Sequence, residues 1–143
     1  MLVSAILAEK GRDVATAAPD TPVMSIIEDL SEKNIGAIVV TDERHSVVGI
    51  ISERDVVRAL ANQGATILDQ PVSSFMTQSV VTCSEHESVH DLMSKMTSGR
   101  FRHLPVVADT RLSGIISIGD VVKTRIAEVE REANALRDYI SSN

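Results

Sequence analysis

The sequence is poor in aromatic residues and in cysteine. Phe, Trp and Tyr make up 2% of its 143 residues and tryptophan is absent, so few side chains are available for stacking on nucleic-acid bases. The one cysteine, Cys83, excludes an intramolecular disulfide and gives no sign of an oxidising compartment. These shortages argue against a single-strand-binding protein and against a disulfide-stabilised secreted domain.

Positive charge and long hydrophobic runs are also lacking. Lys and Arg number 14 against 20 Asp and Glu, and the net charge of −6 argues against general binding to nucleic-acid phosphates. No apolar run approaches the roughly 18 residues of a membrane helix, and the one at the N-terminus is too short for a signal peptide. We therefore expect a cytoplasmic protein with neither a nucleic-acid nor a membrane partner.

A repeated phrase is the most informative feature that the chain does have. "GIISERDVV" at residues 49–57 returns as "GIISIGDVV" at residues 114–122, with seven of nine positions identical. The preceding stretches also align, because residues 14–40 lie over residues 80–106 at an offset of 66. The chain therefore contains two copies of one unit, each too small to bury both faces of a sheet alone.

Each copy is predicted to form a strand, a helix, two strands and a second helix. Apolar residues at helical spacing precede the β-branched runs "AIVV" and "VVGIIS", and the next helix opens near Asp55 or Asp120. This predicts an α/β (α+β) fold in which two β-α-β-β-α units pack sheet to sheet with pseudo-two-fold symmetry. We assign residues 1–143 to a single module, which consists of a first unit (8–63), a linker (64–76), a second unit (77–126) and a C-terminal amphipathic helix (127–143).

The doubled phrase resembles that of the cystathionine-β-synthase (CBS) domain pair, also called a Bateman module. The resemblance rests on "GIISERD" and "GIISIGD", on "NIGAIVV" and "RFRHLPVV", and on "FMT" at residues 75–77. It implies a regulatory, energy-sensing module and not an enzyme. Such pairs bind AMP, ADP, ATP, NAD(H) or S-adenosylmethionine in two symmetry-related clefts and associate into homodimers.

The Ser-x-x-Asp part of the phrase has two interpretations. Ser52 with Asp55, or Ser117 with Asp120, can form a capping box at a helix start. Alternatively, the carboxylate can accept hydrogen bonds from both hydroxyls of a ribose, with the serine in support. The resemblance favours the second interpretation and assigns ribose binding to both pairs.

Phosphate contacts are predicted mainly from the second copy. "RFRH" at residues 100–103 places three basic side chains where the first copy has glycine and alanine at two aligned positions. Strand alternation predicts Arg100 and Arg102 on one face and His103 on the other. They form either a solvated edge or a phosphate site, and the resemblance supports phosphate binding by Arg102 and His103. Arg54 of the first phrase is a further phosphate candidate. The second phrase has Gly119 at that position, so the two clefts are not predicted to be equivalent.

The beginning of each copy supplies two further candidates. Thr16 and Thr82 open the first strands, where members of the resembled family often contact adenine or phosphate, although threonine is also an ordinary strand residue. Gly49 and Gly114 are predicted to let the strand backbone approach a neighbour or a ligand closely.

Two other patterns, a metal-like spacing and a set of possible catalytic groups, are not assigned to a site. Cys83, His86 and His90 have a spacing that invites a metal site, but the alignment places them on different elements and no fourth ligand is evident. No nucleophile, base and orienting group are brought together, so no catalytic residue, catalytic cofactor or metal is assigned.

At the C-terminus an apolar stripe (Ile126, Val129, Ala133, Leu136 and Ile140) is predicted to cover either its own domain or another chain.

Taken together, these features predict a ligand sensor. It binds an adenine nucleotide, with AMP favoured, between its two copies and signals by a change in conformation or oligomeric state. We expect a homodimer through the helices of the pair and an unidentified regulated protein acting in trans. The alternative is a dimerisation scaffold with degenerate pockets, which predicts no response to ligand.

Overall fold

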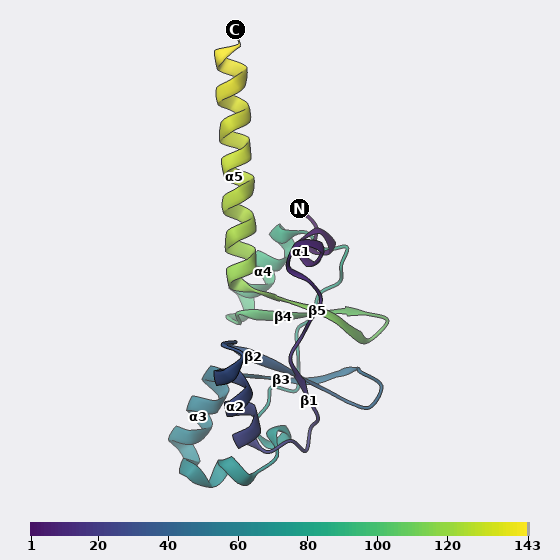
Figure 1. Ribbon diagram of the computed structural model, residues 1–143, viewed down its shortest axis with the longest axis vertical. Coiled ribbons are helices and arrows are strands. Elements are labelled where there is room, and N and C mark those ends of the chain that lie inside the picture. The colour runs from purple at the N-terminus through teal and green to yellow at the C-terminus, as the bar shows by residue number, and fades with distance from the viewer. Residues whose placement is uncertain (143) are drawn as a thin grey trace.

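The computed structural model describes residues 1–142 and contains two small sheets that face each other in the middle of the molecule (Figure 1). Helices α2 (Val23–Glu32) and α3 (Glu53–Gln63) cover the outer side of one sheet. Helices α1 (Val3–Lys10) and α4 (Val89–Gly99) cover the outer side of the other. The predicted α/β architecture with sheet-to-sheet packing is confirmed.

The first copy forms a three-stranded sheet in the order β1 (Thr16–Ala17), β2 (Ala37–Thr41) and β3 (Val47–Ser52). Strand β1 runs parallel to β2, and β2 pairs antiparallel with β3. Every residue of β2 is buried, because helices cover one face of the strand and the second sheet covers the other. The predicted order of strand, helix, strand, strand and helix is therefore present here in full.

The second copy is the same unit with a shorter beginning. Strands β4 (His103–Ala108) and β5 (Arg111–Ser117) form an antiparallel pair. The expected first strand is reduced to one parallel bridge between Cys83 and Val106. Helix α5 (Ile118–Ser141) follows β5, as α3 follows β3 in the first copy.

Each copy is completed by the segment that precedes the other copy. Helix α1 comes before the first copy, yet Val3, Ile6 and Leu7 are buried in the core of the second. The linker between the copies forms two short 3-10 helices, η1 (Gly64–Asp69) and η2 (Val72–Ser74), and Val72 and Phe75 pack in the core of the first. This exchange ties the two units into one module.

The repeated glycines make this exchange sterically feasible. A Cβ atom on Gly49 would lie 2.4 Å from Met76 Sδ, and one on Gly114 would lie 2.7 Å from Leu7 Cδ2. Both distances are shorter than side-chain carbons tolerate, so any larger residue would force Met76 or Leu7 to shift. The prediction of a close approach is confirmed, and the neighbour in each case is the exchanged segment.

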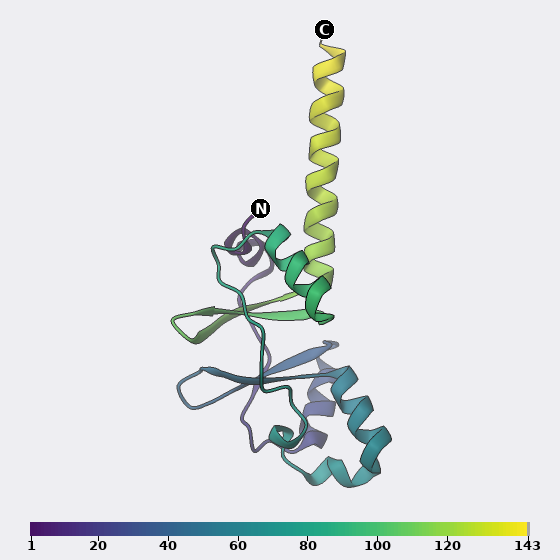
Figure 2. The ribbon, with the colours of Figure 1, turned by 180° about the vertical axis from the view of Figure 1, so that it is seen from behind.

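Helix α5 departs from the body after its first turns. Val121 is buried, whereas every residue from 129 to 142 is exposed. Figures 1 and 2 show the helix extending well beyond α1 and the N-terminus. Among residues 1–142, no helix combines the length and the apolar character needed to cross a membrane.

Candidate functional site: two unequal clefts

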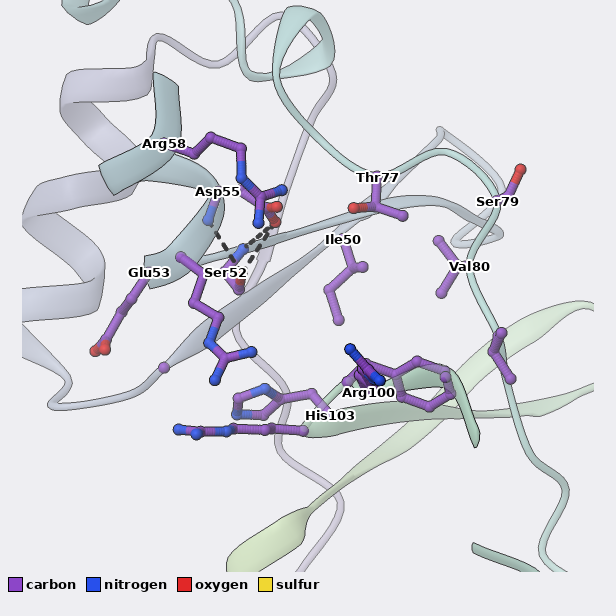
Figure 3. Close-up of a pocket in the computed structure, with 16 residues that line it drawn as sticks. Ile50, Ser52, Glu53, Asp55, Arg58, Thr77, Ser79, Val80, Arg100 and His103 are labelled. Atoms are coloured by element: carbon purple, nitrogen blue, oxygen red, sulfur yellow. Dashed lines mark hydrogen bonds between the residues drawn. The ribbon is translucent and has the colours of Figure 1, made fainter. Parts of the chain in front are cut away.

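A cavity of about 370 Å³ opens where three segments meet (Figure 3). They are the start of α3 with its N-cap (residues 52–58), the start of the second unit (residues 77–81) and the turn from α4 into β4 (residues 99–103). We call this cavity cleft 1. Its walls come from both copies, because α3 belongs to the first and the other two segments lead into the second.

The carboxylate of Asp55 is held in place at one wall of cleft 1. The backbone N–H and the hydroxyl of Ser52 donate to Asp55 Oδ2 at 2.9 and 3.0 Å, and Asp55 N–H donates to Ser52 Oγ at 3.3 Å (Figure 3). The capping box therefore forms. It uses only Oδ2, and Oδ1 accepts no hydrogen bond from residues 1–142. Capping and ligand binding are compatible at this residue.

Arginine side chains give cleft 1 a charge opposite to that of the whole chain. Four arginines line it against two carboxylates, a formal balance of +2 in a protein of net charge −6. Within the described chain, none of the four guanidinium groups has a carboxylate within 4.0 Å. Uncompensated guanidinium groups in a concave site attract a planar or tetrahedral anion. The four are Arg54, Arg58, Arg100 and Arg102.

The stretch that carries Arg100 to His103 is not a strand, contrary to the expectation of alternating faces. Arg100 has φ 56° and ψ 34° and caps α4 in the left-handed conformation, while β4 begins only at His103. The expectation that His103 faces away from the two arginines is wrong, because all three line cleft 1. The turn gathers them where an extended strand would have separated them.

His103 adds an imidazole to the lining of cleft 1. Burial lowers the pKa of its imidazole, and Lys10 and Arg102 lower it further, while Glu53 and Asp120 oppose the change. The ring is therefore neutral near pH 7 and offers one donor and one acceptor.

A second cavity, cleft 2, lies at the position related to cleft 1 by the internal repeat. It has a volume of about 640 Å³ and is lined by Lys10, by residues 13–15 and 33–37, by Ile115 and Ser117, and by His103, which it shares with cleft 1. At the offset of 66, residues 13–15 align with 79–81, and residues 34–37 align with 100–103. The two clefts are thus built from equivalent backbone, but among residues 1–142 no arginine lines cleft 2, and its cations are Lys10 and Lys33.

The carboxylate of Asp120, beside cleft 2, forms an ion pair with Lys10. Asp120 forms the same capping box with Ser117, and Lys10 Nζ lies 2.6 Å from Asp120 Oδ2 and 2.9 Å from the carbonyl oxygen of Ile115. Burial by itself would raise the pKa of the Asp120 carboxyl, but the bonds from Lys10 and Ser117 outweigh it and hold that pKa below its ordinary value. Lys10 and Ser117 both contact Oδ2, and Oδ1 accepts no hydrogen bond from residues 1–142, as in Asp55, but the Asp120 charge is neutralised by Lys10 and Asp120 does not line the cavity.

Two residues predicted to bind ligand lie outside the clefts, and two residues at the clefts were not predicted from the sequence. Thr16 lies in β1 and Thr82 next to Cys83, and neither lines cleft 1 or cleft 2. Arg58 lines cleft 1 without having been assigned, although it follows Arg54 by four residues on α3, a spacing that could have found it. Lys10 had no such signal, because its partner Asp120 lies 110 residues away in the sequence.

The metal pattern does not assemble. Among residues 1–142, no three Cys, His, Asp or Glu side chains are placed to hold a metal ion. Burial, reinforced by Glu87, raises the pKa of the Cys83 thiol to about 12. A thiol in that state is protonated at neutral pH and is a poor ligand and nucleophile.

Known proteins share both the sequence pattern and the fold. The family model of the CBS domain matches residues 4–62 and 72–126. A CBS-domain-containing protein of Agrobacterium tumefaciens superposes with a TM-score of 0.84 at 50% identity, over 87% of this chain and 99% of that one. The chain spans 66%, 71% and 68% of the length of three curated relatives.

Two similar structures contain adenosine compounds. The CBS domain pair of the protein MJ0100, in complex with 5′-methylthioadenosine and S-adenosyl-L-methionine, matches with a TM-score of 0.80 at 29% identity over 90% of this chain and 98% of that one. A CBS domain protein of Pyrobaculum aerophilum complexed with AMP matches with a TM-score of 0.75 at 26% identity over 84% and 89%.

Proposed function

This chain belongs to the CBS domain family, and we propose that it is a regulatory module that binds one adenosine-containing ligand, AMP by preference, in cleft 1. ADP, ATP, NAD(H) and S-adenosylmethionine are the other candidates. The adenosine complexes of two related structures support the ligand class. The observation that carries the choice of cleft is that four unpaired arginines line the same cavity as the oriented carboxylate of Asp55.

The residues of cleft 1 match the parts of a nucleotide. Asp55 Oδ1 accepts from the ribose hydroxyls, while Ser52 keeps the carboxylate in position. Arg100, Arg102 and Arg54 supply cations for the phosphate, and His103 adds a neutral hydrogen-bonding group. The base lies against residues 77–81 and Ile50, where apolar side chains line the cavity. S-adenosylmethionine carries no phosphate and benefits least from the arginines.

The same placement provides a route from binding to signalling. A ligand in cleft 1 bridges α3 of the first copy and the α4–β4 turn of the second, so it favours one relative orientation of the two. Helix α5 is joined directly to β5 of the second copy and carries that orientation outward. Exposed apolar residues on the helices of the pair, such as Val57, Leu60 and Met93, support a homodimer. The regulated protein acts in trans, and the module itself binds reversibly without turnover.

The test is thermal unfolding with AMP, ADP, ATP, NAD, S-adenosylmethionine and inorganic phosphate, followed by calorimetric titration with the best ligand. A ligand present at a hundred times its dissociation constant adds about 2.7 kcal/mol and raises the melting temperature by several degrees. We expect stabilisation by adenosine compounds and none by inorganic phosphate at matched concentration.

A matched pair of variants locates the site. Asp55→Asn keeps the size of the side chain and should weaken binding by about 1–3 kcal/mol, the scale for a charged hydrogen bond. Asp120→Asn makes the same change beside cleft 2 and should leave the affinity unchanged. If Asp120→Asn weakens binding more than Asp55→Asn does, cleft 2 is the site and the proposal is wrong.

A dimerisation scaffold with degenerate pockets is the second candidate, and the Lys10–Asp120 ion pair favours it for cleft 2. A flat response of the wild-type protein across the whole panel, with stability that depends on protein concentration, would extend that assignment to cleft 1.

A further inference from the structure

We propose that the projecting part of α5 pairs with α5 of a second copy of this chain as a parallel, two-stranded coiled coil. Six apolar residues along the helix recur at alternating steps of four and three, which is the a and d spacing of a heptad repeat. We call these residues the α5 seam. It consists of Val122, Ile126, Val129, Ala133, Leu136 and Ile140.

The protein does not cover the seam with its own residues. Val129, Leu136 and Ile140 are 47%, 60% and 66% exposed. Successive residues turn by about 100° around a helix, so the seam lies roughly a quarter-turn away from the side on which Val121 is buried against the body. Of the two outcomes predicted for the apolar stripe, the structure therefore excludes packing on the rest of the described chain.

A helix with this exposure needs a partner to be stable. The 24 residues of α5 extend for about 36 Å, and the last half lies outside the folded body (Figures 1 and 2). Isolated helical segments of this length are marginal in water, and most helix stability in proteins comes from packing of the apolar face. Pairing of two seams would supply that packing.

Charge identifies the partner as a second copy in parallel orientation. Beside the seam, the g positions are Arg125 and Glu132, and the e positions five residues further on are Glu130 and Arg137. In a parallel pair, each g side chain faces the e side chain of the next heptad on the other helix. Arg125 then meets Glu130 of the second copy, and Glu132 meets Arg137. Two-fold symmetry produces each attraction twice.

The antiparallel alternative brings like charges together. The register that superposes all six seam residues places Glu132 against Glu132 of the other copy, and Glu130 against Glu130. It also places Lys123 against Arg137. Because each of these contacts is repulsive, the same residues that favour the parallel pair oppose the antiparallel one.

This inference does not depend on ligand binding in cleft 1. A parallel pair places the two folded bodies at the same end of the coiled coil, because both helices leave the body at their N-terminal ends. It adds to the homodimer proposed above a specific contact far from both clefts.

Disulfide trapping tests the pairing and its direction in the full-length chain. In a parallel pair, residue 136 faces its own copy, so Leu136→Cys should form a covalent dimer under mild oxidation. Ala135→Cys, one residue away and off the seam, is the matched control and should not. The native Cys83 is 2% exposed, so the wild-type protein should stay uncrosslinked. Equal crosslinking of the two variants, or crosslinking only when Ile126→Cys and Leu136→Cys are mixed, would overturn the proposal.

Charge reversal gives a second, independent readout. Arg137→Glu should weaken dimerisation at least threefold in sedimentation equilibrium, because two attractions become repulsions, and Glu132→Arg/Arg137→Glu should restore it. Tighter association of Arg137→Glu would indicate the antiparallel pair, and a trimeric mass would exclude the two-stranded one. Both results overturn the proposal. The melting response of Leu136→Cys to AMP should equal that of the wild type, so failure here and failure of the ligand proposal are separable.

Discussion

The two clefts have equivalent backbones but different charged side chains. In cleft 1 the carboxylate of Asp55 is capped only by Ser52 and faces unpaired arginines. Beside cleft 2 the carboxylate of Asp120 has the same cap but is neutralised by Lys10 at 2.6 Å. The larger cavity is the one that no arginine among residues 1–142 lines, so volume and charge do not point to the same ligand site. The repeat supplies the same backbone to both clefts, and the side chains that differ between the copies decide the chemistry of each.

The largest expected effect comes from removing the cations that only cleft 1 has. Arg100→Gln/Arg102→Gln should weaken AMP binding by about 100-fold, since each charged hydrogen bond contributes about 1.5–3 kcal/mol. The slope of affinity against salt concentration should also flatten. Calorimetric titration at two salt concentrations measures both effects.

Arg44→Gln/Arg111→Gln is the control for this double variant. It removes two exposed arginines that line neither cleft, so it changes net charge equally. If the control weakens binding as much, general electrostatics and not the geometry of cleft 1 accounts for the affinity.

Replacing the glycines that contact the exchanged segments should lower the free energy of unfolding by different amounts. Gly114→Ala should lower the free energy of unfolding by about 2 kcal/mol, because the added carbon meets the buried Leu7. Gly49→Ala should cost less, since Met76 is a flexible and only partly buried side chain. Gly119 lies in the first turn of α5, and a Cβ atom there would lie 3.5 Å from its nearest neighbour, Ser117 Oγ, so Gly119→Ala should be neutral or slightly stabilising. Urea denaturation of the three variants checks the order, and equal losses at Gly114 and Gly119 would contradict it.

Removing the cation beside cleft 2 should make the two clefts more alike. Lys10→Met introduces the residue type that stands 66 positions later, at Met76, and removes the ion pair from the Asp120 carboxylate. We expect AMP to bind cleft 2 about tenfold more tightly, which moves the calorimetric stoichiometry from one site towards two. Thermal unfolding without ligand checks that the variant is folded. An unchanged stoichiometry would show that the missing arginines, and not Lys10, disable cleft 2.

The smallest predicted effect is a dependence of affinity on pH through His103. Burial holds the pKa of this imidazole below its ordinary value, so the free protein carries it neutral, and a bound phosphate favours the protonated form. Affinity should therefore rise a few-fold as the pH falls from about 7.5 to about 6. AMP itself gains a proton in this range, so the measurement is the difference in slope between the wild type and His103→Gln. Identical slopes would exclude a role for His103.

Local features of the chain were predictable because they depend on neighbouring residues. The capping boxes of Ser52 with Asp55 and of Ser117 with Asp120 need only a spacing of three at a helix start. The β-branched runs and the repeat at an offset of 66 were sufficient to predict two similar units. Gly49 and Gly114 indicated a close approach, although not which segment approaches.

The sequence by itself therefore determined two sheet-forming units, their capped helices and the two positions at which a carboxylate is oriented. Only the tertiary structure decided that α1 packs on the second unit, which brings Lys10 to a carboxylate 110 residues away. It also decided that Arg100 turns into the left-handed conformation and joins Arg54 in one cleft. The physical reason is that such contacts depend on how the chain crosses between the two units, which no local pattern of side chains records.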